Sequence, residues 1–222
     1  MAIPKIEELL DLTHTLAAPL FAGKRYPWEI LPLLKDFIRE LGASLPREEY
    51  DEIAPEVWAH KTAKIAPTAL IMGPTVIGAS TEVRHCAFIR GSALIGENCV
   101  VGNSTEVKNA VIFDNVQVPH YNYVGDSILG FRSHMGAGVV ASNFRSDKGN
   151  VGVRDGDGKI ETGMRKLGAI LGDGVDVGCN SVLCPGSVVG RDTVVYPLSR
   201  VRGSIPEKSI LKGDGSIVPR KI

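Results

Sequence analysis

The sequence predicts a mainly β protein built as a parallel β-helix, and three observations lead to that fold. Every sixth position over one long stretch is a β-branched aliphatic: Ile65, Ile71, Ile77, Val83, Ile89, Ile95, Val101 and Val107. A second run keeps the same period: Leu171, Val177, Leu183, Val189, Val195 and Val201. A small residue often follows the aliphatic, as in Gly78 and Gly96. Neither a helical period nor simple strand alternation produces this pattern. A hexapeptide solenoid does, because each aliphatic points into one stacked core.

Between the two runs the rhythm is looser, and single steps are marked by Val124, Leu129 and Met135. One β-helix is therefore predicted over residues 57–207, interrupted at residues 143–166 and followed by a tail at 208–222. The period does not give the handedness, since the usual preference for right-handed crossovers is not a guide to solenoids of this kind.

Residues 1–56 are predicted to form an N-terminal two-helix arm with a linker. Apolar residues recur at helical spacing over residues 4–17 and again over 28–41, and Gly42 is expected to end the second helix. The acidic stretch at residues 47–52 is expected to be the linker. Such an arm would cap the open first coil or pack on a neighbouring subunit. The alternative is a lid over a substrate site.

The composition narrows the possible partners. Lys and Arg number 25 and so do Asp and Glu, so no overall field attracts nucleic acid or anionic lipid. No apolar run reaches membrane length, and the first residues lack a signal-peptide core. The cysteines at 86, 99, 179 and 184 lack metal-ligand spacing and are expected to be reduced thiols. These features predict a soluble cytoplasmic protein with no nucleic-acid or membrane partner.

Two cations are predicted to lie one coil apart. Arg90 follows Ile89 and Lys108 follows Val107, a separation of 18 residues, or three hexapeptides. Their side chains should leave the same corner about 4.8 Å apart. Cations this close repel each other unless an anion lies nearby. They could pair with Glu106 or Asp126, be solvated, or bind a phosphate.

A polar segment with a histidine follows within less than one coil. His120 begins the run His120-Tyr-Asn-Tyr-Val-Gly-Asp126, and a histidine there could accept a proton near neutral pH. A lone histidine can equally have a structural role. Gly136-Ala-Gly138 leaves backbone N–H groups accessible to a thioester carbonyl or oxyanion, although tight corners explain these glycines equally well.

Taken together, these motifs carry a specific resemblance. Gly102-Asn-Ser-Thr-Glu-Val-Lys108, the His120–Asp126 run, Gly136–Gly138 and Asn143 resemble the acetyltransferase domain of bifunctional N-acetylglucosamine-1-phosphate uridylyltransferases. Asn143-Phe-Arg-Ser-Asp147 and Arg165-Lys-Leu-Gly168 resemble its archaeal branch. The resemblance covers residues 57–207, and the arm takes the place of the family's nucleotidyltransferase domain. It implies a left-handed β-helix, a homotrimer with sites between subunits, acetyl-CoA as cosubstrate, no metal, and a place in nucleotide-sugar metabolism.

The resemblance also implies residue roles in an N-acetyltransferase that acts on an amino-sugar 1-phosphate such as glucosamine 1-phosphate. His120 would be the catalytic general base. The substrate-binding residues would be Arg90 and Lys108 for the phosphate and Tyr123 and Asn143 for the sugar. The residues near acetyl-CoA would be Ala137, Lys166 and Cys179.

Three positions depart from the family pattern, and they leave another function open. Phe144 replaces a tyrosine, Cys179 a serine and His134 an asparagine. A non-catalytic protein that binds a sugar phosphate or a nucleotide sugar on the same fold is the alternative. A zinc-dependent carbonic anhydrase of the same architecture is disfavoured, because His85 and His120 lack the expected third histidine.

Overall fold

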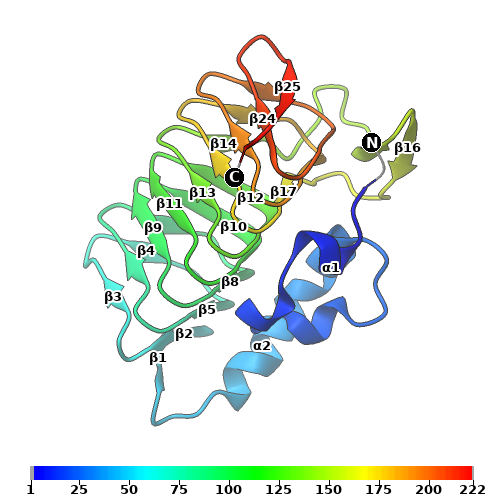
Figure 1. Ribbon diagram of the computed structural model, residues 1–222. Coiled ribbons are helices and arrows are strands. Elements are labelled where there is room, and N and C mark those ends of the chain that lie inside the picture. Colours follow the sequence, from blue (N-terminus) through cyan, green and yellow to red (C-terminus); the bar gives the residue numbers. More distant parts are fainter. Residues whose placement is uncertain (1–2, 222) are drawn as a thin grey trace.

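Three faces of short parallel strands stack around one hydrophobic core (Figure 1). The computed structural model describes residues 3–221, so the outermost residues of the predicted arm and tail, at 1–2 and 222, lie outside it. Strands pair with the next coil in parallel register, as in Ile65 with Val83 and Ile71 with Ile89. The prediction of a left-handed parallel β-helix is confirmed.

The three faces are named here by a residue or segment that marks each. The His120 face consists of β3 (Lys64–Ile65), β6 (Glu82–Val83), β9 (Val100–Asn103), β11 (Gln117–His120), β13 (His134–Met135), β18 (Asp176–Val177), β21 (Val194–Val195) and β24 (Ser209–Leu211). The Lys108 face consists of β4 (Leu70–Ile71), β7 (Phe88–Ile89), the first parts of β10 (Glu106–Ile112) and β12 (Tyr123–Leu129), β14 (Val140–Ala141), β19 (Val182–Leu183) and β22 (Arg200–Val201). The arm face consists of β2 (Val57–His60), β5 (Thr75–Ile77), β8 (Ala93–Ile95), the second parts of β10 and β12, β17 (Ala169–Leu171), β20 (Ser187–Val189) and β23 (Ser204–Ile205).

The core is built by the period-six aliphatics. Val101, Val107 and Leu171 are fully buried, and so are the residues that mark the looser stretch, such as Leu129 and Met135. The rhythm loosens because some coils are one residue shorter: Val100 pairs with Gln117, and Gln117 pairs with His134. The interruption is an inserted hairpin of β15 (Gly152–Asp155) and β16 (Gly158–Glu161) at the corner between the Lys108 and arm faces.

The arm is less helical than its apolar spacing predicts. It contains α1 (Ile6–Leu9), the 3-10 turns η1 (Leu12–His14), η2 (Ala18–Phe21) and η3 (Pro27–Leu33), and α2 (Leu34–Ser44). The first predicted helix ends early because carbonyl groups of this segment hydrogen-bond to the β-helix. The carbonyl of Leu9 accepts the N–H of Asp173, and the carbonyl of His14 accepts the N–H of Asp114, both at 3.1 Å. The second begins late because Pro32 cannot donate to an α-helical ladder.

The arm does not cap the first coil, although capping that coil was one of the positions expected from the sequence. It lies along the arm face, where α2 contacts β5, β8 and β10 (Figure 1). The outward-facing residues of these strands are therefore buried, among them Val76, Leu94 and Val111. Strand β1 (Tyr50–Ala54), in the predicted linker, instead pairs antiparallel with β2 and protects the first edge.

Two further details at the ends of elements differ from expectation. Gly42 does not end its helix, since α2 continues to Ser44. The stacked strands also continue past Glu207: β24 pairs in parallel with β21, and β25 (Ile217–Pro219) then covers β24 antiparallel. No helix in the part of the chain that the structure describes is both long and apolar enough to cross a membrane.

Candidate active site

Arg90 and Lys108 lie on neighbouring coils where the Lys108 face ends. The register of β7 on β10 pairs Ile89 with Val107, and the Arg90 N–H donates to the carbonyl of Val107 at 2.8 Å. The two cations therefore leave the same corner of the solenoid. Their row continues through Gly125, Ser142, Cys184 and Arg202 on later coils, and is called the cation row below.

Each of these two cations has an acidic partner in the same chain. Arg90 donates to Glu106 at 2.6 Å, and this hydrogen bond raises the pKa of the Arg90 guanidinium. The Lys108 ammonium lies 3.7 Å from a carboxylate oxygen of Asp126. These are the pairings that the sequence left open. An exposed ion pair contributes little to stability, so a doubly charged phosphate can compete for Arg90.

Asp126 is a buried carboxylate that connects several polar side chains. It is 4% exposed and accepts from Asn109 Nδ2 at 2.8 Å and from Asn143 Nδ2 at 2.5 Å, in addition to facing Lys108. A buried carboxylate is costly unless it is paired and hydrogen-bonded in this way. The sequence suggested Asp126 only as a partner of Lys108. The signal in the sequence was that Asp126 stands in the run Val124-Gly-Asp-Ser-Ile-Leu129, where a carboxylate was to be expected among buried neighbours.

Asn143 carries this network to the inserted hairpin. Its side chain also donates to the Tyr123 hydroxyl at 3.1 Å, and burial raises the pKa of that hydroxyl. Its carbonyl accepts the N–H of Leu167 at 3.0 Å, and Phe144 forms a bridge with Lys166. The base of the insertion is thereby closed, with exposed Lys166 beside Asn143 and Phe144.

His120 is exposed at the end of β11. It lies at one edge of the Lys108 face, and the cation row lies at the other edge. Its backbone is fixed on both sides: its N–H donates to Asn122 Oδ1 at 3.1 Å, and its carbonyl accepts the N–H of Gly138 at 3.0 Å. Asn122 is itself buried and donates to the carbonyl of Gly136 at 2.7 Å. The imidazole forms no hydrogen bond with residues 3–221, so both ring nitrogens can meet a ligand.

Ala137 and Cys179 follow His120 along the same corner on successive coils. The N–H of Asn180 donates to the carbonyl of Ala137 at 2.8 Å, which sets their register. The Ala137 N–H meets no acceptor within the described chain, and the Cys179 thiol is exposed. Gly138 keeps this turn narrow, since a Cβ there would lie 2.2 Å from Asn180 Oδ1. His120, Ala137 and Cys179 together are called the His120 corner.

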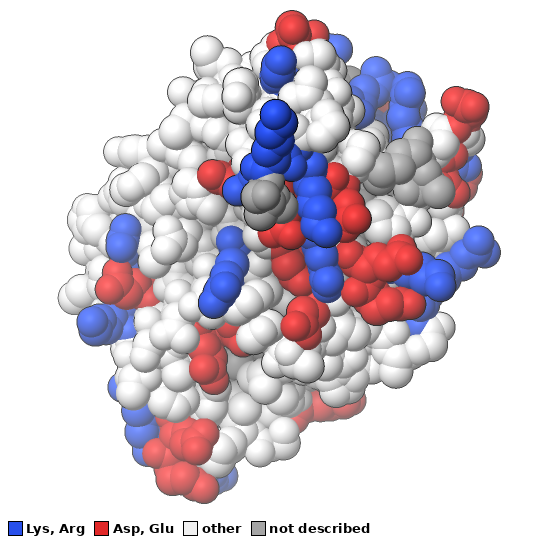
Figure 2. Space-filling view, viewed as in Figure 1, with Lys and Arg blue, Asp and Glu red and all other residues white. Residues whose placement is uncertain are grey.

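The predicted residues thus form two groups on the two edges of one face. Lys108, Tyr123 and Asn143 are joined through Asp126, and Arg90 lies on the next coil. The His120 corner forms the other group. Figure 2 shows basic and acidic side chains interleaved on the side in view, with no large area of a single sign.

His85 and His120, the two histidines considered as zinc ligands, do not form a metal site within residues 3–221. The coil of Asn103 lies between those of His85 and His120. Within residues 3–221, no three His, Cys, Asp or Glu side chains are grouped as metal ligands would be.

Comparisons with known proteins agree with the resemblance. Residues 71–213 match the family model described as the GMPPB C-terminal domain. The chain is 31% identical over 199 residues to the bifunctional protein GlmU of Methanococcus maripaludis strain S2, covering 88% of this chain and 48% of that protein. It is 35% identical over 156 residues to the putative uncharacterized acetyltransferase YaiX of Escherichia coli K12, covering 70% of this chain and 68% of that protein.

The prediction of similarity to the bifunctional sugar-1-phosphate enzymes of archaea is confirmed by these matches. The chain spans about a third to a half of the first of these relatives, 33% of one Methanococcus maripaludis protein and 48% of another. Among solved structures, a hexapeptide transferase family protein from Anaplasma phagocytophilum is similar with a TM-score of 0.49 and 18% identity, covering 75% of this chain and 81% of that one.

Proposed function

The chain belongs to the GMPPB C-terminal domain family, and we propose that it is an N-acetyltransferase which transfers the acetyl group of acetyl-CoA to an amino-sugar 1-phosphate, such as glucosamine 1-phosphate. One observation carries the proposal. On one edge of the Lys108 face, Lys108, Asn143 and Tyr123 are organised around buried Asp126, and on the other edge the His120 imidazole has no hydrogen-bond partner among residues 3–221.

In this proposal the phosphate and the sugar are held first. Arg90 and Lys108 bind the phosphate oxygens, and charge-assisted hydrogen bonds of this kind are the strong ones. The Tyr123 hydroxyl and the Asn143 amide orient the sugar hydroxyl groups. Because Asp126 already fixes Asn143 and faces Lys108, these groups reorganise little when substrate binds.

Acetyl-CoA supplies the acetyl thioester. The His120 imidazole takes one proton from the attacking amine as the new N–C bond forms, and that proton then passes to the departing CoA sulfur. The N–H of Ala137 is suited to the oxygen of the thioester carbonyl, because it has no acceptor in the described chain. The His120 corner leaves room for the thioester, because Gly138 adds no side chain to the turn and Cys179 presents only a small one. Lys166 lies at the base of the insertion, beside Asn143, and in this proposal it also contacts acetyl-CoA.

The arrangement also supports a homotrimer. The arm covers one face of the solenoid, which leaves the His120 and Lys108 faces for neighbouring copies. Their two groups of residues lie on separate edges, and a neighbour that covers the Lys108 face would enclose them in one site. The relatives named GlmU and YaiX, the second described as an acetyltransferase, lend support to the activity.

The second candidate is a non-catalytic protein that binds a sugar phosphate or nucleotide sugar. The observations in its favour are Phe144 and Cys179, which give the sugar and acyl-donor sides a different chemistry from the family pattern. Such a protein has no reason to bind acetyl-CoA.

Acetyl transfer to glucosamine 1-phosphate distinguishes the two candidates. The purified chain is incubated with acetyl-CoA and glucosamine 1-phosphate, free CoA is measured with a thiol reagent, and the product is identified by its mass. N-acetylglucosamine 1-phosphate is the matched control, because its amine is already blocked. Calorimetric titration with acetyl-CoA is run beside it. Absence of both acetyl transfer and acetyl-CoA binding would rule out the enzyme and favour the binding protein.

A further inference from the structure

A hollow of about 930 Å³ lies between the inserted hairpin and the later coils of the β-helix. Its walls are the β15–β16 hairpin on one side and the corner loops at residues 184–186 and 200–203 on the other. None of the eight residues that sequence analysis assigned to the active site lines it. Its volume is within the range of small-molecule sites, about 300–1,000 Å³.

The hairpin wall is fixed in place. Val151 and Val153 are buried, and β15 contacts β20 and β23 on the arm face. The carbonyl of Arg154 accepts from Ser204 Oγ at 2.8 Å, and the carboxylate of Asp155 accepts the N–H of Ile3 at 2.8 Å. The coils and the arm both hold β15, so the hollow exists before any ligand arrives.

The lining of the hollow is basic although the chain has no net charge. It contains five cations, Arg145, Arg154, Lys159, Arg200 and Arg202, and two carboxylates, Asp147 and Asp157. Two of the cations are neutralised: Arg145 pairs with Asp147, and Lys159 pairs with Glu161.

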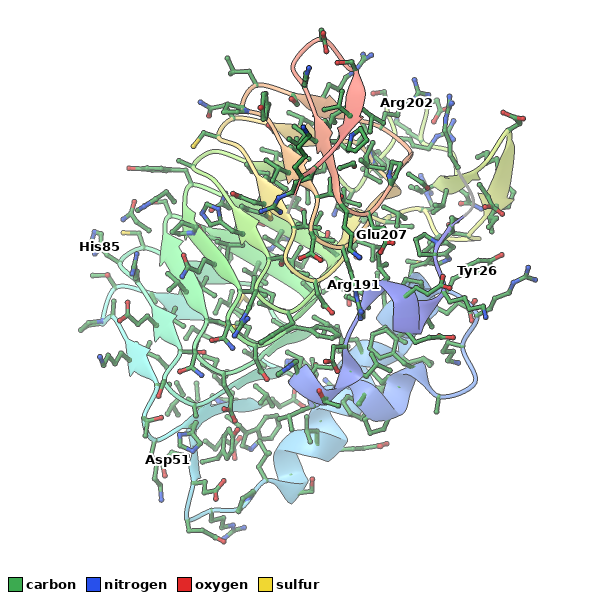
Figure 3. The ribbon with its side chains drawn as sticks, viewed as in Figure 1. Tyr26, Asp51, His85, Arg191, Arg202 and Glu207 are labelled. Atoms are coloured by element: carbon green, nitrogen blue, oxygen red, sulfur yellow. The ribbon has the colours of Figure 1, made fainter. Side chains whose placement is uncertain are left out.

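Three guanidinium groups remain without a counter-ion. Arg154, Arg200 and Arg202 make no ion pair with any residue from 3 to 221. They come from both walls, since Arg154 is on β15 whereas Arg200 begins β22. Figure 3 shows Arg202 on the side of the solenoid that the hairpin covers. Asp157, the lining carboxylate outside the two pairs, offsets one of these charges, so the described lining keeps an excess of two positive charges, which repel each other unless an anion occupies the hollow.

The side chains suit a phosphate-bearing ligand with an aromatic part. A guanidinium group offers a planar fork of donors that matches phosphate oxygens. The Phe144 ring, 39% exposed, also lines the hollow and offers an apolar surface to a planar base. We propose that this hollow binds a nucleoside diphosphate.

This site is distinct from the Arg90–Lys108 pair. Along the cation row, Lys108 is followed by Gly125, Ser142, Cys184 and then Arg202, each on the next coil. Four steps of about 4.8 Å put Arg202 about 19 Å from Lys108. The inference rests on the hairpin and its arginines and does not require the proposed acetyl transfer. The diphosphate could belong to a free nucleotide, to CoA, or to a nucleotide-linked sugar.

Calorimetry on the full chain with ADP, UDP, CoA and inorganic phosphate tests the site. Arg154→Ala and Arg202→Ala are each expected to weaken binding of the preferred nucleoside diphosphate by about 10- to 100-fold, the effect of a lost charged hydrogen bond. Arg47→Ala is the matched control, because Arg47 is exposed, lies outside the hollow and makes no ion pair with the described residues. Binding should also weaken as salt is raised.

The other measurements identify the source of the diphosphate or overturn the proposal. If CoA is the ligand, Arg202→Ala also raises the KM for acetyl-CoA. If a free or sugar-linked nucleotide is the ligand, UDP or ADP binds while that KM is unchanged. The proposal fails if no nucleoside diphosphate binds at millimolar concentration, or if Arg47→Ala weakens binding as much as the two pocket variants. It also fails if inorganic phosphate binds as well as ADP and UDP, since the hollow would then hold an adventitious ion only.

Discussion

Asp126 is the residue that connects the phosphate-binding and sugar-binding parts of the candidate site. Its carboxylate faces Lys108 and accepts from Asn109 and Asn143, so one buried charge fixes the positions of three side chains. The carboxylate tolerates burial because three donors surround it. Removing any one donor leaves two, and we therefore expect substitutions here to affect ligand binding more than folding.

Lys108→Ala is expected to weaken the binding of glucosamine 1-phosphate by about 1.5–3 kcal/mol, the usual worth of a charged hydrogen bond. The melting temperature should change little, because Asp126 keeps its two amide donors. Calorimetry and thermal unfolding measure the two effects. Lys64→Ala, at an exposed position on the His120 face, is the control. Unchanged affinity together with a lower melting temperature would mean that Lys108 is structural.

His120→Ala is expected to lower kcat by about 10²–10⁴, the usual contribution of general-base catalysis. The affinity for the sugar phosphate should stay within a few-fold, because Arg90 and Lys108 still hold the phosphate. His85→Ala serves as a control, two coils away from His120. A His120→Ala variant with near-normal kcat would contradict the mechanism.

The cysteines provide a test of where acetyl-CoA binds. Burial raises the pKa of the Cys99 thiol to about 12, so it should resist alkylation at neutral pH. Cys86 and Cys179 are both exposed and should react. Acetyl-CoA is expected to slow the alkylation of Cys179 several-fold and to leave Cys86 unaffected, as measured by mass spectrometry of the alkylated peptides. Equal rates with and without acetyl-CoA would place its binding site away from Cys179.

At the scale of elements, the packing of α2 on the arm face depends on one close contact. Gly42 lies in the last turns of α2, directly over the ring of Trp58 on β2. A Cβ at residue 42 would lie 2.2 Å from Trp58 Cε3. The glycine is therefore required by packing and not by the end of the helix.

Gly42→Ala is expected to lower the stability of the protein by up to about 2 kcal/mol, the overpacking cost less the gain in helix propensity. Alanine improves helix propensity by about 1 kcal/mol, but overpacking against Trp58 costs about 1–3 kcal/mol and also displaces the helix from its sheet. Ala43→Gly, at the exposed neighbouring position, should cost only the propensity term of about 1 kcal/mol. Chemical denaturation measures both. A Gly42→Ala protein more stable than wild type would show that α2 can move away without loss.

The strands of the arm face explain why this arm is needed. All but β23 present an apolar residue outward beside the one that points into the core, as in Val76 with Ile77 and Leu94 with Ile95. Strands buried on both sides need a cover. This pattern was present in the sequence and indicated that some segment covers one face of the solenoid.

At the scale of the whole molecule, two faces remain uncovered in the single chain. The proposed trimer would use them, and its mass by light scattering is expected to be about three times 23.8 kDa. A monomer at micromolar concentration would argue strongly against shared sites.

Mixing two impaired variants, assayed at a low concentration of glucosamine 1-phosphate, tests whether the sites are shared between subunits. His120→Ala and Lys108→Ala chains, unfolded together and refolded in equal amounts, should regain about a quarter of the wild-type activity if each site takes His120 and Lys108 from different subunits of a symmetric trimer. Each variant refolded alone is the control. No recovery from a trimer shown by mass to be mixed would mean that one chain supplies both residues.

The sequence by itself determined the β-helix and the relative placement of Arg90 and Lys108. Both follow from a period, because each coil repeats the same local geometry and residues one coil apart must stack. Only the tertiary structure decided the path of the arm, the burial of Asp126 and the hollow beneath the β15–β16 hairpin. These depend on contacts between segments that share no period, such as Gly42 with Trp58 and Ile3 with Asp155. Contacts of that kind are fixed by side-chain shape and by available donors and acceptors across the folded chain, which spacing along the sequence does not encode.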